Sequence, residues 1–221
     1  MEHGSSERNA RQGTTVLGID PGLTRCGLGV IAGTANRPRL VATDCARTGA
    51  DLPLEQRLRI VHKAVETAIA EHRPDAVAVE RVLFSSNVRT AMATGQAAGV
   101  ALLAAAQAGI PVHAYSPTDV KLTVAGSGDA DKDAVARLVG AALHLAEPPR
   151  SADVTDALAV ALTHLVRGRL AALTAGTPAA AVIADAQRLA GRAARGGWEA
   201  VLAERAAGSS RRAHDRNGGR P

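Results

Sequence analysis

The 221-residue chain is poor in aromatic side chains and in cysteine, with one Phe, one Tyr, one Trp and two Cys. Apolar residues nevertheless make up 46% of the chain, so a hydrophobic core must be built from Ala, Val, Leu and Ile. Two cysteines are too few for a disulfide framework. We therefore expect one domain of ordinary size, in which Cys26 and Cys45 are buried free thiols of a protein in a reducing compartment.

Long hydrophobic runs are also missing. No segment approaches the ~18 consecutive apolar residues that a membrane-spanning helix needs. The first residues, MEHGSSERNARQG, are polar and lack the apolar stretch of a secretory signal. Both absences predict a cytoplasmic protein with no membrane partner.

Lysine is scarce as well, because the 26 basic residues include only Lys63, Lys121 and Lys132. The net charge of +5 favours a polyanionic partner such as nucleic acid. Most of this charge lies at the C-terminal end: residues 174–221 hold 8 Arg against 4 acids, whereas residues 1–173 carry +1. A nucleic-acid surface in the rest of the chain must therefore be a local cationic patch.

The chain begins with three strand-like runs joined by tight turns and then alternates helices and short strands. This order predicts an α/β domain with a mixed sheet over residues 14–173. Residues 1–13 are expected to be disordered, and residues 174–221 to form an Ala- and Arg-rich tail, partly helical with a disordered end. The expected strands are 14–20, 25–32, 40–47, 76–79 and a run within 109–117, and the expected helices are 54–73, 88–107, 118–124, 132–145 and 153–173.

Acidic residues close two of the apolar strands: LGID ends at Asp20 and VAVE ends at Glu80. The last helix opens with SADVTDALAVAL, in which Asp153 and Asp156 share one face of the first turn. Because ligands bind at the carboxyl ends of strands in open α/β sheets, the four acids are candidates for one site. Each acid also has a local explanation: a turn for Asp20, a strand end at solvent for Glu80, and a helix cap or the helix dipole for the aspartate pair.

Four clustered carboxylates would repel each other and raise one another's pKa unless a cation lay among them. Oxygen ligands without His or Cys suit Mg²⁺ or Mn²⁺ rather than zinc. Such sites commonly hold two ions ~3.5–4 Å apart, which clamp the attacking and departing oxygens of a phosphodiester. The acids therefore lead to the hypothesis of a two-metal nuclease.

Five motifs follow one another along residues 15–170: GIDPGLTRCGLGVI, VAVERV followed by N-x-x-T, GQAAG, DVKLTVAGSGDADK and SADVTDALAVALTH. In order and spacing they resemble the motifs of the RuvC-type Holliday-junction resolvases, which are crossover junction endodeoxyribonucleases. The resemblance implies a ribonuclease-H-like fold, that is, a mixed five-stranded sheet flanked by helices. It also implies a homodimer that uses Mg²⁺, with Mn²⁺ as a substitute, to nick two strands of like polarity at a four-way DNA junction. Cooperation with the RuvA–RuvB branch-migration complex in recombination and repair is implied as well.

The resemblance also assigns roles to single residues. The four acids match the family's catalytic residues, which hold two metal ions in each site. Lys121 and Lys132 match basic positions that meet the DNA, and Phe84, Asn87 and Arg89 are further candidates for DNA binding.

The chain departs from the family pattern at two places. The aromatic residue expected three positions after Glu80 is Leu83, and Phe84 follows it, so Phe84 either stacks at the junction centre or packs in the core. The loop 129–133 contains three aspartates and is more acidic than a DNA-facing loop should be.

Two further features have alternative interpretations. His164 is expected to be a hydrogen-bonded structural histidine rather than a neighbour of the metals. The helix over 88–107 carries small residues that suit packing on its own sheet and a dimer contact equally well. These residues are Ala91, Gly95, Ala98 and Gly99.

Two other functions fit the same residues: a catalytically impaired junction-binding protein, and a ribonuclease-H-like nuclease that acts on another branched nucleic acid. The motif GIDPGLT also resembles the first phosphate loop of actin-like sugar kinases, but their duplicated domains need more than ~300 residues. The presence of all four acids favours an active nuclease.

Overall fold

The computed structural model of the chain describes residues 13–81, 87–147, 149 and 151–174. The chain divides into two compact units, Met1–Arg169 and Leu170–Pro221, and the sites described below lie in the first. The N-terminal segment and the tail after residue 174 lie outside the described residues. Their expected disorder and helicity, and the domain limits 14–173, therefore stay predictions.

The helices and strands follow the order that the sequence predicts, and most of their boundaries agree within a few residues. The strands are β1 (Thr14–Asp20), β2 (Arg25–Thr34), β3 (Arg37–Arg47), β4 (Ala76–Glu80) and β5 (Val112–Tyr115). The helices are α2 (Leu54–His72), α3 (Val88–Gln107), α4 (Pro117–Ala125), α5 (Lys132–Ala142) and α6 (Ala152–Thr174).

The hairpin between β2 and β3 is tighter than expected. Thr34 pairs with Arg37, which leaves Ala35 and Asn36 as a two-residue turn. Two-residue turns match the twist of antiparallel strands, so both strands continue to the turn. The predicted third strand, which starts at residue 40, therefore begins too late, because Arg37 and Pro38 belong to β3 rather than to the turn.

Two helices begin or end where local hydrogen bonds and backbone angles require it. α4 starts at Pro117 because the Ser116 hydroxyl accepts a hydrogen bond from the Asp119 N–H, and the Asp119 carboxylate accepts one from the Ser116 N–H. α5 ends at Ala142, earlier than predicted, because His144 adopts a left-handed backbone with φ 54°.

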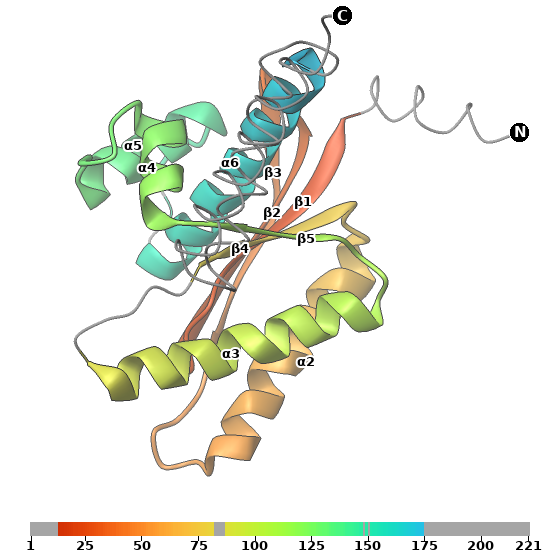
Figure 1. Cartoon of the computed structure of the whole chain (residues 1–221), viewed down its shortest axis with the longest axis vertical. Coiled ribbons are helices and arrows are strands. Elements are labelled where there is room, and N and C mark those ends of the chain that lie inside the picture. Colours follow the sequence, from red (N-terminus) through yellow and green to blue (C-terminus); the bar gives the residue numbers. More distant parts are fainter. Residues whose placement is uncertain (1–12, 82–86, 148, 150, 175–221) are drawn as a thin grey trace, which may run out of the picture. The chain divides into compact units, whose positions relative to one another are not determined.

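The five strands form one mixed sheet in the order β3-β2-β1-β4-β5 (Figure 1). β1, β2 and β3 form an antiparallel meander, whereas β4 and β5 run parallel to β1. β1 lies at the centre and is buried on both faces, with Val16, Leu17 and Ile19 fully buried. This explains why its sequence is a continuous apolar run rather than an alternating one.

Helices cover both faces of the sheet (Figure 1). α2 and α3 pack on one face over Leu17, Ile19 and Val77, while α4, α5 and α6 pack on the other over Val16 and Ile31. As the composition predicts, both layers are built almost entirely from Ala, Val, Leu and Ile. The expected α/β architecture, a mixed five-stranded sheet flanked by helices, is confirmed.

The two cysteines differ in burial. Both are free thiols, but only Cys26 is buried, whereas Cys45 is half-buried. The expectation that both thiols are buried is therefore wrong for Cys45. Cys45 lies on β3, which is an edge strand with a less completely covered face.

The last helix lies unusually close to the sheet because two glycines face it. A Cβ atom on Gly18 of β1 would lie 2.0 Å from the Ala157 carbonyl oxygen, and a Cβ on Gly27 of β2 would lie 2.0 Å from the Asp153 carbonyl oxygen. Only glycine permits this approach. The two contacts fix the first turns of α6 against the strands that end near it.

No helix in the described part of the chain is long and apolar enough to cross a membrane.

We predict that Gly18→Ala lowers the free energy of unfolding by ~1–3 kcal/mol, because the new methyl group would overlap the backbone of α6. The matched control is Gly168→Ala on the same helix, where a Cβ atom has nothing within 4 Å. This control should gain ~0.5–1 kcal/mol from helix propensity. Urea unfolding of both variants measures the difference, and equal stabilities would contradict the close contact.

Candidate active site

Two parallel strands bring Asp20 and Glu80 to the same edge of the sheet. β1 and β4 are neighbours, and their last register pair is Ile19 with Val79. Asp20 and Glu80 are the next residues on each strand, so their backbones end side by side. Both carboxylates are half-buried there.

The first turn of α6 brings the aspartate pair to the same place. The Gly27 contact holds the backbone of Asp153 against β2. The Asp153 carboxylate also accepts hydrogen bonds from two groups at its Oδ2 atom: the Arg25 Nε at 2.7 Å and the Ser151 hydroxyl at 3.1 Å. The Arg25 Nη2 in turn donates to the Ser151 hydroxyl at 3.2 Å. Asp153 is therefore held by both its backbone and its side chain.

The pKa values report how strongly the four acids interact. Burial, and next the negative charges of Glu80, Asp156 and Asp153, together raise the pKa of Asp20 to about 7, while Lys132 opposes them. Burial and then the charge of Asp156 also raise the pKa of Glu80. The structure thus places the four acids within electrostatic reach of one another.

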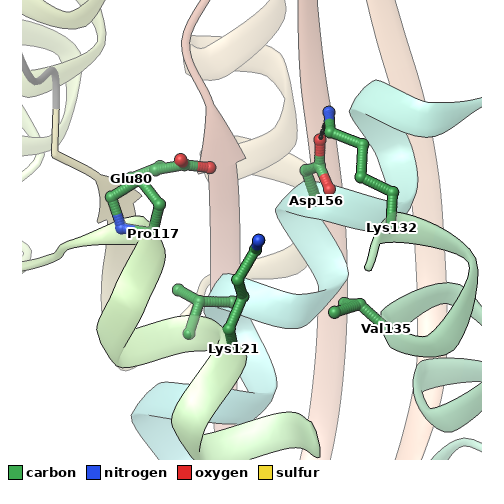
Figure 2. A pocket seen from close by; sticks show the side chains of 7 residues that line it. Glu80, Pro117, Lys121, Lys132, Val135 and Asp156 are labelled. Atoms are coloured by element: carbon green, nitrogen blue, oxygen red, sulfur yellow. Dashed lines mark hydrogen bonds and ion pairs between the residues drawn. The ribbon is translucent and has the colours of Figure 1, made fainter. Parts of the chain in front are cut away.

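Two lysines lie beside the acids. The Lys132 Nζ is 3.3 Å from the Asp156 Oδ2, and this charge raises the pKa of the lysine. Lys121, on α4, points into the space between Glu80 and Asp156 (Figure 2). The pocket has a volume of about 90 Å³ and is lined by Glu80, Pro117, Val120, Lys121, Lys132, Val135 and Asp156.

The donor set of this edge suits a hard divalent cation. All four acids offer oxygen, which Mg²⁺ and Mn²⁺ prefer. Burial and then the negative charge of the other acids raise the pKa of Asp20, and a cation would neutralise that charge. Among the described residues, no three Asp, Glu, His or Cys side chains are already arranged around one point as metal ligands. Arg25 and Lys132 instead pair with two of the acids, so cation binding requires these side chains to exchange partners.

The segment after β4 is described only in part. Asn87 is the N-cap of α3, and its side chain accepts a hydrogen bond from the Thr90 N–H at 3.2 Å, which explains the N-x-x-T spacing structurally. Arg89 is exposed on the first turn of the same helix. Leu83 and Phe84 lie outside the described residues, so both interpretations of Phe84 stay predictions.

His164 lies on α6, two turns beyond the aspartate pair, and is engaged elsewhere. Its Nδ1 is hydrogen-bonded to the Tyr115 hydroxyl at 2.8 Å, and its ring lies 4.4 Å from that of His113. Burial and then the His113 charge lower the pKa of His164 to about 4, so it is neutral at pH 7. This agrees with a hydrogen-bonded structural histidine.

Sequence reasoning missed Arg25 and Ser151, which hold Asp153. Ser151 carries a local signal, because its carbonyl accepts the first α6 hydrogen bond, from the Thr155 N–H at 3.0 Å, as an N-cap does. Arg25 has no such signal. Its partner, Asp153, lies far away along the sequence, and only the packing of α6 on β2 brings the two side chains together.

Comparisons with known proteins agree with this architecture. The family model of crossover junction endodeoxyribonuclease RuvC matches residues 16–164. The RuvC of Salinispora arenicola is 54% identical over 154 residues, which cover 69% of this chain and 88% of that relative. The structure of T. thermophilus RuvC in complex with Holliday junction substrate is 42% identical, covers 71% of this chain and 96% of that chain, and has a TM-score of 0.69. The yeast mitochondrial Holliday junction resolvase Ydc2 is 12% identical with a TM-score of 0.50, covers 70% of this chain and 80% of its own, and is similar in fold alone.

We predict that Asp20 makes the metal-free protein less stable as the pH rises from about 4 to about 7. In this window the folded protein keeps a proton on Asp20, whose pKa is about 7, whereas the unfolded chain has lost it above the ordinary value of 3.8. The unfolded state then binds fewer protons, so stability falls with rising pH. Asp20→Asn should be more stable than the wild type by on the order of 2 kcal/mol at pH 8, and equally stable at pH 4.

Urea unfolding in EDTA at several pH values measures this difference. His164 changes stability in the opposite direction over the same window, because its pKa is lowered to about 4, but it is present in both proteins and cancels. Asp129→Asn, at an exposed loop acid, serves as the control and should follow the wild type. Parallel curves for wild type and Asp20→Asn would contradict the electrostatic interpretation.

Proposed function

Because the chain belongs to the RuvC family of crossover junction endodeoxyribonucleases, we propose that it resolves four-way DNA junctions by paired, symmetric nicks in strands of like polarity. The convergence of four carboxylates from β1, β4 and α6 carries this proposal. The junction as substrate is supported by the T. thermophilus relative, whose structure is a complex with a Holliday junction. From family membership we further propose a cytoplasmic location and cooperation with RuvA–RuvB in recombination and repair.

The four acids would hold Mg²⁺, two ions in each site, with Mn²⁺ as a substitute. When bound, such ions polarise the scissile phosphate and lower the pKa of an attacking water. Asp20 must lose its proton to serve as a ligand, and because its pKa is about 7, metal affinity should rise with pH up to neutrality. Its place at the end of a fully buried strand keeps the carboxylate from moving away from its neighbours.

The cationic side chains have a complementary role in this proposal. Lys121 and Lys132 line the same pocket as Glu80 and Asp156, within reach of a phosphate held at the acids. Once a divalent cation neutralises Asp156, the Lys132 amine can donate to phosphate oxygens instead. Asn87 and Arg89 would contact DNA at the start of α3.

A homodimer is supported by the surface of α3. Its exposed side carries residues at alternating spacings of four and three, which is the pattern of a helix that packs along another helix. Two of them, Gly95 and Gly99, have nothing within 4 Å of a Cβ atom, although glycine costs ~1 kcal/mol at such positions. The stripe consists of Val88, Met92, Gly95, Gly99 and Leu102.

The burial of the small residues on α3 separates their two interpretations, which are packing on the sheet of the same chain and contact with a second chain. Ala98 is buried on the molecule's own core, whereas Gly95 and Gly99 face outward. Met92 is 61% exposed, an unfavourable state for so large an apolar side chain. We propose that a second copy of the chain covers the stripe and that the resulting two-fold dimer presents two equivalent sites to the junction.

The alternative of a catalytically impaired junction-binding protein has the same fold. It is disfavoured because a carboxyl whose pKa is raised to about 7 by burial and by three neighbouring acids destabilises the protein and is of use only with a cation. A nuclease for another branched nucleic acid differs only in substrate, so it is separated by comparing junction, flap and hybrid substrates.

We predict that Asp20→Asn abolishes cleavage of a labelled four-way junction in Mg²⁺, while the dissociation constant in EDTA changes less than about twofold. Phosphate contacts position the DNA and do not need the acid. Denaturing gels follow the cut strands, and gel shift follows binding. The wild type should yield paired nicks at symmetric positions with Mg²⁺ and none in EDTA.

Two results would contradict this proposal. Cleavage by Asp20→Asn at the wild-type rate would remove Asp20 from the site. Binding without cleavage by the wild type, in Mg²⁺ and in Mn²⁺ alike, would favour the impaired junction-binding protein.

We predict that Gly99→Leu converts the dimer to a monomer, because the new side chain blocks close approach of two helices without touching its own fold. Light scattering after size exclusion should give the mass of two chains for the wild type and of one for the variant. Gly168→Leu, on an equally open site of α6, is the control and should remain dimeric. A dimeric Gly99→Leu protein with unchanged dissociation constant would rule out the α3 stripe.

A further inference from the structure

A second group of cations lies on the other side of the acids from Lys121 and Lys132. Arg25, the first residue of β2, and Arg47, the last residue of β3, are direct partners in the antiparallel ladder. Directly opposite side chains share one face of a sheet and lie close together, and like charges at such positions are destabilising. The pair therefore lowers the stability of this end of the hairpin.

Arg25 and Arg47 differ in their partners. Arg25 forms an ion pair with Asp153, so the sheet face that carries Arg25 and Arg47 lies next to the candidate site. Arg47 is exposed and takes part in none of the hydrogen bonds or ion pairs found among the described residues. Its guanidinium is thus a charge next to the candidate site with no carboxylate of its own.

Arg57, on α2, adds a third cation at the same end of the sheet. Its Nε donates to the Thr48 hydroxyl at 2.8 Å and its Nη2 to the Thr24 hydroxyl at 2.8 Å. Thr48 follows Arg47 directly, and Thr24 precedes Arg25. Arg57 is half-buried, yet no ion pair in the described part of the chain involves it.

Neutral hydroxyls orient the Arg57 guanidinium without neutralising it. A fixed guanidinium with no counter-ion is suited to bind an anion, since its remaining N–H groups can form charge-assisted hydrogen bonds with phosphate oxygens. Arg57 contacts Thr48, the residue that follows Arg47, so both arginines lie at the same end of the sheet, and the two are called the arginine patch below. They lie in a part of the chain whose overall charge is close to neutral.

We infer that Arg47 and Arg57 bind backbone phosphates of the DNA, so that the strand to be cut crosses the acids between this arginine patch and the two lysines. The inference rests on the proposed function, because it takes the junction as the polyanion. A phosphate bound at Arg47 would also offset the repulsion between Arg47 and the opposite Arg25.

The β3 strand provides a matched pair of variants for the test, because it begins with Arg37 and ends with Arg47, and both are exposed. Only Arg47 lies at the end near the acids. R47Q and R37Q remove the same charge, so a general effect of net charge appears equally in both. The probe is a fluorescent four-way junction titrated in EDTA at several KCl concentrations.

We expect R47Q to reduce the slope of log affinity against log salt by ~0.9, the value for one phosphate contact. If wild type and R47Q bind equally at about 1 M salt, where the contact is screened, a slope difference of ~0.9 over the decade down to about 0.1 M gives a loss of roughly eightfold in affinity at 0.1 M. R37Q should keep the wild-type slope, and R47Q should melt at the wild-type temperature or slightly above it, because it removes the repulsion between Arg47 and Arg25.

The inferred role of Arg47 would be overturned if R47Q kept the wild-type slope of log affinity against log salt, or if R47Q and R37Q lost the same affinity. The proposed function would still stand, because the wild type binds the junction. Failure of the wild type to bind the junction would overturn both.

Arg57 needs a second comparison, because it also joins three segments through Thr24 and Thr48. R57K keeps the charge and R57Q removes it, while both lose the paired contacts to the two threonines. A phosphate contact predicts a slope close to wild type in R57K and lower by ~0.9 in R57Q, with similar melting temperatures for the two variants. Equal slopes in R57K and R57Q would assign Arg57 to the fold alone.

Discussion

The repulsion among four carboxylates on a rigid frame is the interaction on which this structure depends. Asp20 and Glu80 end neighbouring parallel strands, and the glycine contacts press α6 so closely on β1 and β2 that Asp153 cannot withdraw. The backbone therefore cannot move the carboxylates apart, and only protonation or a bound cation lowers the electrostatic energy of the cluster. The pKa of Asp20 is raised to about 7 by burial first and then by the charges of Glu80, Asp156 and Asp153, so ionising this carboxyl is unfavourable in the absence of a cation.

The chain's own cations relieve this repulsion unevenly. Arg25 pairs with Asp153 and Lys132 with Asp156, so the two acids on the helix are neutralised, whereas the two on the strands have no such partner. Positive side chains thus lie at the rim of the site, and the carboxylates of the two strands lie at its centre. In the proposed function, divalent ions at the centre and phosphates at the rim would complement this distribution, so metal binding and DNA binding would support each other.

Much of this arrangement could be predicted from local patterns. Strand and helix order, the core of small aliphatic residues and the acids at two strand ends follow from periodicity and from the rule that parallel strands end at one edge. Partners far apart in sequence could not be predicted: the pairs Arg25–Asp153 and Tyr115–His164 exist only because of how helices pack on the sheet. Observed helix ends differed from the predicted ones where a capping box or a left-handed residue determines the end. The predicted burial of Cys45 was wrong because the burial of a residue on an edge strand depends on the layer that covers it.

The position of α6 in the chain has a consequence for biosynthesis. This helix is the last element of the sheet domain, and it supplies both the cover for Val16 and Ile31 and two of the four acids. A chain still emerging from the ribosome therefore lacks part of the cover on this sheet face and half of the acidic cluster until α6 is released. Translation order ensures that no nuclease centre is assembled before the domain has been made in full.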